Sequence, residues 1–357
     1  MISLKSNVEG GLTTWFEDVY LIHNAISEVT FDDINLEVSF LGHKLKAPLL
    51  IAGMTGGHDF SLKINSALAE AAEKLGIAIG VGSQRAAIEN PKLRYTYSIV
   101  REKAPTAFVI ANIGAAQVAR YLKYEDLQEV ISMIDANALA VHLNLLHEIL
   151  QPEGQPNFKG LLTRLQEIKS LLKVPLIIKE TGSGISKEVA HTLSNVVDAI
   201  DVGGAGGTNW ALVEYERAKR QEKYSLMRLS KLLLAWGIPT AISICEVRAT
   251  LPNMPLIATG GIRTGLDIAK AIALGADLVG IALPLLRAAY SEGKEGVIKT
   301  LEQMIFELKA IMVLVGASTI EELKRVPIMF SHRFIEWLKY RELEEFIRRR
   351  CSNLTTI

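Results

Sequence analysis

Eight short apolar runs, rich in β-branched residues, alternate with amphipathic helical patterns along most of this chain. A continuous apolar run predicts a strand buried on both faces, and such strands are typical of parallel sheets joined by right-handed helical crossovers. Eight alternations close most naturally into a (β/α)8 TIM barrel, so the predicted fold class is α/β. A doubly wound open sheet is the alternative, because periodicity alone does not show closure. The predicted strands are Leu49–Met54, Ile77–Ser83, Phe108–Ile113, Ala138–Asn144, Leu176–Lys179, Ala199–Gly203, Leu256–Gly260 and Leu278–Ala282.

Three segments fall outside this alternation. Residues 1–46 predict an N-terminal cap, in which a strand pair at 35–45 covers the bottom of the barrel. Residues 210–250 predict a helical insertion after the sixth strand, with the charged stretch 214–223 exposed to solvent. Residues 286–357 predict a helical tail. Because there is no internal repeat or low-complexity linker, we expect a single domain whose barrel spans residues 47–285.

The composition excludes several classes of function. The 39 basic and 39 acidic residues cancel, so no net field favours nucleic acid or an anionic membrane. There is no signal-like N-terminus and no uncharged apolar stretch of about 18 residues, which together predict a cytoplasmic protein. The two cysteines, Cys245 and Cys351, have no metal-binding spacing and form no disulfide framework.

Two glycine-rich turns follow the predicted sixth and seventh strands. One is the run Asp201-Val-Gly-Gly-Ala-Gly-Gly-Thr-Asn-Trp210, and the other is Ala258-Thr-Gly-Gly-Ile-Arg263. Glycine lets a phosphate approach the backbone N–H groups, and the predicted helix at 265–270 would add the positive end of its dipole. Either turn alone could be an ordinary loop, but two in succession favour a cofactor phosphate site.

Polar side chains stand at the carboxyl ends of nearly all the predicted strands, where barrel enzymes carry their active sites. The segment from His142 to Glu148 brings two imidazoles, an amide and a carboxylate to one rim, a set that can bind a metal or move protons. An ordinary polar loop is the alternative there. Lys179 is either a rim residue with its ammonium in water or a cation aimed at a bound anion or an electron-rich ring.

Taken together, these motifs resemble the type 2 isopentenyl diphosphate isomerases, in one register over residues 10–345. The resemblance implies a barrel, assembled as a homotetramer or homo-octamer, that uses reduced FMN and Mg²⁺ to interconvert isopentenyl and dimethylallyl diphosphate, with NAD(P)H needed only as reductant. The motifs are Met54-Thr-Gly-Gly57, Gly82-Ser-Gln-Arg85, Ala111-Asn-Ile-Gly114, His142-x-Asn144, Gln151-Pro-Glu-Gly154, Lys179-Glu180, Gly206-Gly-Thr-Asn-Trp210, Gly260-Gly-Ile-Arg263 and Ala282-Leu-Pro284.

The resemblance also implies roles for individual residues. Lys179 would stabilise negative charge on the reduced flavin, His147 would act with it at the reacting end of the substrate, and Glu148 would hold Mg²⁺. The residues implied to hold FMN are Met54, Thr55, Ser83, Asn112, Lys179, Thr208, Gly260, Gly261, Arg263, Ala282 and Leu283. The residues implied to bind the small-molecule diphosphate are Ser83, Gln84, Arg85, His142, Asn144 and His147.

The chain departs from the family pattern in two places. His147 stands where the family has glutamine, and it adds a titratable proton next to Glu148. The family also begins with an Arg-Lys-x-x-His segment that clamps the diphosphate, whereas Lys5 is the only basic residue here before His23. Either the coding sequence starts upstream of Met1, or the chain is a flavoprotein paralogue that acts on another substrate.

Three other functions are weighed against the isomerase. An α-hydroxy-acid oxidase uses a histidine just beyond the seventh strand, and no histidine occurs between His191 and His332. A nucleotide dehydrogenase of related architecture needs a nucleophilic cysteine after the sixth strand, and none occurs between residues 203 and 244. A non-catalytic flavin-binding barrel remains open, although His142, Asn144 and Glu148 at the rim favour an enzyme.

Overall fold

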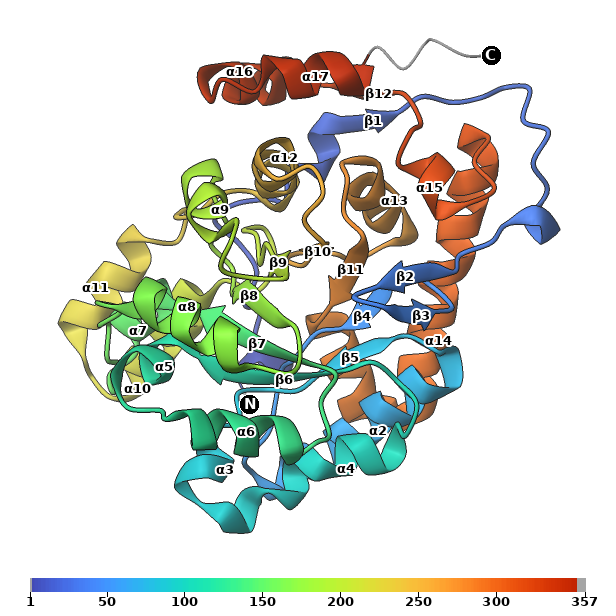
Figure 1. The fold of residues 1–357 in the computed structure, drawn as a ribbon. Helices are drawn as coiled ribbons and strands as arrows, with labels where there is room; N and C mark the ends of the chain where they lie inside the picture. Colours follow the sequence, from blue (N-terminus) through green and yellow to red (C-terminus); the bar gives the residue numbers. More distant parts are fainter. Residues whose placement is uncertain (1, 352–357) are drawn as a thin grey trace.

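The computed structural model describes residues 2–351, and its centre is a closed barrel of eight parallel strands. Each strand pairs with its neighbour in the chain, and β11 closes the ring by pairing with β4, so the predicted (β/α)8 topology is confirmed and the open sheet is wrong (Figure 1). The strands are β4 (Leu49–Ile51), β5 (Ala78–Gly80), β6 (Val109–Gly114), β7 (Ala138–Leu143), β8 (Leu176–Glu180), β9 (Ala199–Asp201), β10 (Leu256–Ala258) and β11 (Leu278–Ile281).

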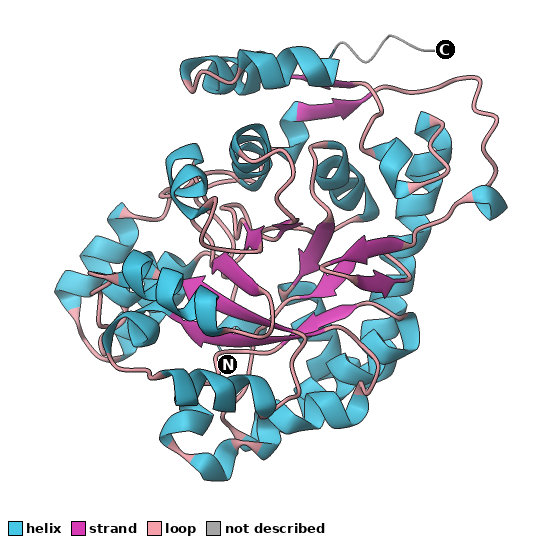
Figure 2. Ribbon diagram, in the orientation of Figure 1, coloured by secondary structure: helices cyan, strands magenta, loops and turns pink. Residues whose placement is uncertain are grey.

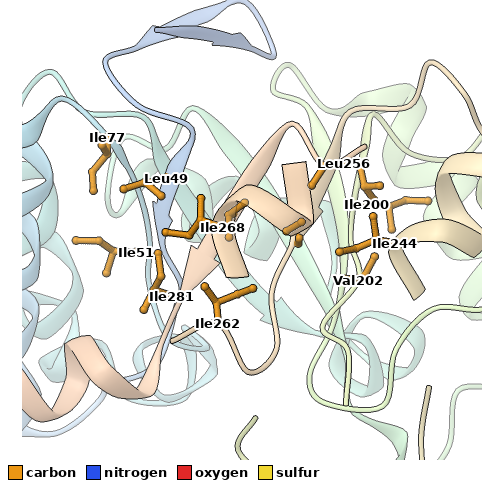
Figure 3. Close-up of a cluster of buried hydrophobic side chains, with 14 of the residues drawn as sticks. Leu49, Ile51, Ile77, Ile200, Val202, Ile244, Leu256, Ile262, Ile268 and Ile281 are labelled. Atoms are coloured by element: carbon orange, nitrogen blue, oxygen red, sulfur yellow. The ribbon is translucent and has the colours of Figure 1, made fainter. Parts of the chain in front are cut away.

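Alternation along each strand divides its side chains between the barrel lumen and the surrounding helices. Leu50 and Ile177 point into the lumen cluster, whereas Ile51 and Ile178 join the larger core between strands and helices. Figure 3 shows this outer layer, in which Ile51 and Ile281 of the wall lie near Ile268 of a flanking helix. The lumen is therefore packed rather than hollow, and only the inward positions at the strand ends can line a site.

Helices surround the barrel on all sides (Figure 2). No helix within residues 2–351 combines the length and apolar character needed to cross a membrane. The helices are α1 (Ile2–Lys5), α2 (Asp59–Leu75), α3 (Arg85–Glu89), α4 (Tyr95–Lys103), α5 (Ala115–Arg120), α6 (Tyr124–Ser132), α7 (Leu145–Leu150), α8 (Leu161–Leu171), α9 (Lys187–Leu193), α10 (Trp210–Arg220), α11 (Tyr224–Leu232), α12 (Thr240–Thr250), α13 (Gly265–Ala273), α14 (Leu283–Val315), α15 (Ile320–Leu323), α16 (His332–Tyr340) and α17 (Glu344–Cys351).

A hairpin of β2 (Val38–Phe40) and β3 (His43–Leu45) covers the bottom of the barrel, which confirms the strand pair predicted at 35–45. Phe40 meets Phe108 edge to face, with ring centroids 6.0 Å apart. Phe40 and Leu45 belong to the same buried cluster as the lumen side chains. The lower end of the lumen is thereby closed by apolar contacts.

The C-terminal tail is not helical throughout, so that prediction was wrong in one place. β12 (Ile328–Phe330) pairs antiparallel with β1 (Val19–Leu21), outside the barrel. Ile328 and Phe330 are buried while Met329 between them is exposed, as expected for a strand with one face on the core. Three alternating residues are too few to separate a strand from a helix by periodicity.

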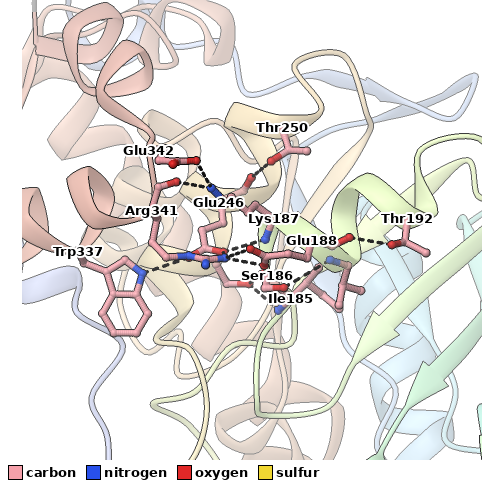
Figure 4. A network of polar contacts seen from close by, with 12 residues as sticks. Ile185, Ser186, Lys187, Glu188, Thr192, Glu246, Thr250, Trp337, Arg341 and Glu342 are labelled. Carbon is pink, nitrogen blue, oxygen red and sulfur yellow. Dashed lines mark hydrogen bonds and ion pairs between the residues drawn. The ribbon is translucent and has the colours of Figure 1, made fainter.

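A polar network ties the tail to the barrel (Figure 4). Glu246 of α12 is fully buried and accepts hydrogen bonds from Arg341, from the Trp337 indole and from the backbone N–H of Lys187. Arg341 also pairs with Glu188 of α9. These hydrogen bonds and ion pairs raise the pKa of Arg341 and fix α16 against α9 and α12.

Candidate active site

The strand register brings three inward-facing polar residues side by side at the upper end of the barrel. His142 of β7 is the register partner of Lys179, and Lys179 of β8 is the partner of Asp201. The Lys179 ammonium lies 3.3 Å from Asp201 Oδ2 and 3.2 Å from the carbonyl oxygen of Glu180. Lys179 is therefore a held cation at the strand ends and not a rim residue reaching into water.

Two cavities open above these residues and share a wall. The first, here the glycine-loop cavity, has a volume of about 190 Å³ and lies between the glycine turns and the start of α14. The second, here the histidine cavity, has a volume of about 270 Å³ and lies above β5 to β8. The residues common to both are Gly53, Met54, Lys179, Thr181 and Trp210. Two ligands placed in these cavities would meet beside Lys179.

The two glycine turns pack against each other at backbone distance. A Cβ on Gly207 would lie 2.4 Å from the Gly261 nitrogen, and Gly260 and Gly261 have φ values of 109° and 75°, which favour glycine. Among the described residues, the N–H groups of Gly260, Gly261 and Ile262 have no acceptor. Unpaired N–H groups lining a cavity are a binding site for an anion. The donors present therefore fit the phosphate of FMN.

The helix predicted after the second turn is α13, and acidic side chains surround its N-terminus. α13 begins at Gly265, and acidic side chains accept from the backbone N–H groups of this residue and of the two residues before it. Asp267 accepts from Thr264 and from the backbone of Arg263, and Glu307 accepts from the backbone N–H of Gly265. The N–H groups that lack an acceptor among the described residues therefore lie in the turn before the helix.

An N-terminal strap, residues 8–14, crosses the same turns. Asn209 donates from its backbone to Val8 and from its side chain to Gly10, both at 2.7 Å. Glu9 forms an ion pair with Arg263, whose Nε lies 3.0 Å from the carboxylate. Arg263 lines the glycine-loop cavity as predicted, but in this state its guanidinium already has an anionic partner.

His147 is held on two sides where it lines the histidine cavity. Its ring stacks on Trp210 with centroids 4.4 Å apart, and its Nε2 lies 2.8 Å from Glu214 Oε1. Glu214 is fully buried and is also paired with Arg217, so the prediction that 214–223 is exposed was wrong at Glu214. Helical periodicity places Glu214 one turn after Trp210, on the face toward the site.

His142 also lines the histidine cavity, as a neutral group. Burial, reinforced by the positive charge of Lys179, lowers its pKa from 6.5 to about 3. Asn112 donates its amide to the Val81 carbonyl, so its Oδ1 accepts from His142 Nδ1 at 2.8 Å. His142 therefore presents Nε2 as an acceptor and does not offer a diphosphate a positive charge.

Glu148 and Asn144 form the acidic corner of the histidine cavity. Glu148 is buried and accepts from the Asn144 amide at 3.0 Å and from the backbone of Gln155 at 2.7 Å. Asn144 Oδ1 is buried without a hydrogen-bond partner. Within residues 2–351, no three His, Cys, Asp or Glu side chains gather as a metal site. The corner fits Mg²⁺ only as a cation that also takes oxygens from a phosphate and water.

Most predicted cofactor residues line the glycine-loop cavity. These are Met54, Lys179, Thr208, Gly260, Gly261, Arg263, Ala282 and Leu283. Ser83 and Asn112 line the histidine cavity instead. Thr55 lines neither cavity, because its hydroxyl is 2.8 Å from the Ser61 hydroxyl.

The predicted substrate residues divide in a similar way. Ser83, Arg85, His142, Asn144 and His147 line the histidine cavity. Gln84 does not: its side chain is fully buried and bonds the Val130 carbonyl and the backbone N–H of Asn112. The geometry therefore gives Gln84 a place in the barrel wall rather than against a diphosphate.

The sequence reasoning missed several residues of the site. Trp210, Asp201 and Thr259 were part of the glycine-rich motifs, but none of them was given a role. The strand parity that places Ile177 and Ile257 inward also places Lys179 and Thr259 inward, so this signal was present. Tyr97, whose hydroxyl donates to the Ser83 carbonyl, gave no local signal because α4 packs there from outside the barrel.

Known proteins related to this chain decide its family. A protein from Methanosarcina barkeri named isopentenyl-diphosphate delta-isomerase is 50% identical over 91% of this chain and 88% of that protein. A protein of the same name from Pyrococcus furiosus is 48% identical over 98% of this chain and 90% of that protein. The chain belongs to the isopentenyl-diphosphate delta-isomerase family. Residues 159–329 also match a family model described as FMN-dependent dehydrogenase.

Solved structures of other proteins have a fold similar to that of this member of the isopentenyl-diphosphate delta-isomerase family. A mandelate oxidase structure matches with a TM-score of 0.63 at 16% identity, over 91% of this chain and 92% of that chain. A second, described with (S)-mandelic acid, gives a TM-score of 0.64 at 16% identity over the same shares. At this identity the likeness shows the barrel alone.

Proposed function

We propose that this chain interconverts isopentenyl and dimethylallyl diphosphate, with reduced FMN in the glycine-loop cavity and the diphosphate in the histidine cavity. The observation that carries the proposal is the wall shared by the two cavities, with Lys179 in it. The names of relatives about 50% identical over nearly the whole chain support the same reaction. When bound, reduced FMN supplies a proton donor and acceptor at N5, and NAD(P)H serves only to reduce it.

The residues of the glycine-loop cavity bind and orient the cofactor. The N–H groups of Gly260 and Gly261, with Arg263, would hold its phosphate. Lys179 would stabilise negative charge on its ring, and Trp210, which lines both cavities, would help to exclude water where they meet.

The residues of the histidine cavity hold the substrate. Arg85 is exposed at the mouth and would pair with the diphosphate, while Glu148 and the free Asn144 Oδ1 would bind the Mg²⁺ that neutralises it. His147 would act at the reacting end of the substrate as a hydrogen-bonding group, oriented by Glu214 on one side and Trp210 on the other.

The test is an isomerase assay on the purified protein. We expect yellow protein that retains FMN rather than FAD and that, once reduced anaerobically, converts isopentenyl diphosphate with Mg²⁺, the product being identified by NMR. Lys179→Ala should lose flavin or turnover, whereas Lys169→Ala, outside both cavities, should lose neither. Flavin-bound protein without turnover would favour a paralogue with another substrate or a non-catalytic flavin-binding barrel.

A further inference from the structure

Asp201 is a buried carboxylate at the end of β9 that touches neither of the two cavities. It is only 2% exposed, and with Lys179 it lines a third, small cavity of about 20 Å³ inside the barrel, below the site. Its neighbours there include the apolar side chains of Ile177 and Ile257. A carboxylate in such surroundings destabilises the fold unless a partner compensates its charge.

The two carboxylate oxygens of Asp201 have different partners. Oδ1 accepts from the Thr259 hydroxyl at 2.5 Å and from the Gly203 N–H at 3.2 Å. Oδ2 faces the Lys179 ammonium at 3.3 Å. The amide oxygen of an asparagine could accept both bonds of Oδ1, so those bonds do not require a charge. Of the contacts of Asp201, only the ion pair with Lys179 requires a negative charge.

Lys179 has a second contact that keeps it in place. Its ammonium donates to the Glu180 carbonyl at 3.2 Å, and both groups stand on the same strand end. Removing the charge of Asp201 therefore leaves the ammonium at the shared wall, but without its counter-ion. The net charge that a ligand meets at that wall depends on both residues.

We propose that Asp201 is the counter-ion that sets how strongly Lys179 acts on the bound cofactor. This inference rests on the proposed function, because it places the FMN ring beside Lys179. A reduced flavin carries more negative charge than an oxidised one, so Lys179 favours the reduced form and Asp201 opposes it. Asp201 thereby lowers the reduction potential of the cofactor without touching it.

Asp201→Asn in FMN-loaded protein tests this directly. The substitution keeps the size of the side chain and an acceptor for Thr259 and Gly203. We expect the ratio of reduced to oxidised flavin at a fixed potential to rise about tenfold, which is about 30 mV for a two-electron couple. The measurement is an anaerobic redox titration against a reference dye. Asp201→Ala, which also removes the charge, should shift the ratio in the same direction if the asparagine variant does not fold.

Asp198, just before the same strand, provides a matched control. It directly precedes β9, pairs with Lys169 at the opposite end of the barrel and accepts from the Leu176 backbone. Asp198→Asn should leave the potential unchanged. Lys179→Met should lower it, and Lys179→Met with Asp201→Asn should return it close to the wild-type value, because two opposite charges are removed together.

The outcomes separate this inference from the proposed function. A wild-type protein that binds no flavin would defeat the proposed function. Flavin bound normally, with a potential unchanged in Asp201→Asn, would defeat only the counter-ion role. A potential that falls in Asp201→Asn, as it should in Lys179→Met, would also defeat the counter-ion role. Asp201 would then only hold the Lys179 side chain in position.

Discussion

His147 places a titratable ring at a position where the family pattern has an amide. Glutamine can form the same hydrogen bond with Glu214 but cannot lose or gain a proton. We therefore expect His147→Gln to keep or raise turnover. His191→Gln, on the exposed face of α9, serves as the control. A variant with no turnover at any pH would show that the imidazole itself is required.

His142 makes the stability of the fold depend on pH. Burial lowers the pKa of His142 from 6.5 to about 3. Between these two pH values the imidazole is protonated in the unfolded chain but stays neutral in the folded chain. The free energy of unfolding should fall as the pH drops from 6.5 towards 3. Urea unfolding at pH 7 and pH 4.5 should show a smaller loss for His142→Gln than for the wild type. An equal loss of unfolding free energy in the two proteins would mean that the His142 pKa is not lowered in the folded chain.

Glu9 competes with an incoming phosphate for Arg263. The ion pair leaves the guanidinium partly neutralised, so a phosphate must displace the carboxylate or lie against a second anion. Glu9→Gln should tighten FMN binding about tenfold, or about 1.4 kcal/mol, measured by fluorescence quenching of FMN. Glu37→Gln, on the hairpin at the far end of the barrel, should leave the affinity unchanged. Weaker binding in Glu9→Gln would instead show that the strap helps to hold the phosphate.

At the scale of elements, α16 depends on one buried charge. Arg341→Ala leaves the fully buried Glu246 without its cation, which should lower the free energy of unfolding by about 3 kcal/mol. Lys339→Ala, an exposed change two residues earlier at the end of α16, should cost well under about 0.5 kcal/mol. Chemical denaturation of both variants checks the difference. A cost for Arg341→Ala no larger than that of the control would show that α16 is held by its apolar face alone.

The regular elements followed from the sequence more reliably than the short ones. All eight barrel strands were predicted because each is a continuous apolar run bounded by glycine or polar residues. The strand pair β1–β12 was not predicted, since its partners are 3 residues each and lie about 300 residues apart in the chain. Glu214 was misplaced because a run of charges normally marks a solvated face, and tertiary contacts with His147 and Arg217 decide otherwise.

For the whole molecule, cofactor binding should appear as added stability. A ligand that binds only the folded state at 100 times its dissociation constant adds about 2.7 kcal/mol. We expect FMN to raise the melting temperature of the cofactor-free protein, and riboflavin, which lacks the phosphate, to raise it much less. An equal effect of the two compounds would contradict the phosphate site in the glycine turns.

The assembly of the chain as a homotetramer or homo-octamer stays a prediction, and light scattering of the purified protein tests it.

The positions of site residues at the strand ends could be predicted from the sequence. The contacts between segments far apart in the chain could not. The eightfold alternation and the polar strand ends predict His142 and Lys179 at one rim. The ion pair of Glu9 with Arg263 joins residues 254 positions apart, and no local pattern signals it. The pairing of Asp201 with Lys179 lies between these cases, because strand parity and register together would have found it.

The N-terminal strap has a consequence for the order in which the protein is made. Val8 and Thr14 are synthesised some 200 residues before Asn209 and Ala241, on which they dock. Contacts between such distant residues form late in folding. Until they form, the glycine turns lack their cover and Arg263 lacks Glu9. A newly made chain should therefore take up FMN faster than a fully folded one that has been stripped of it.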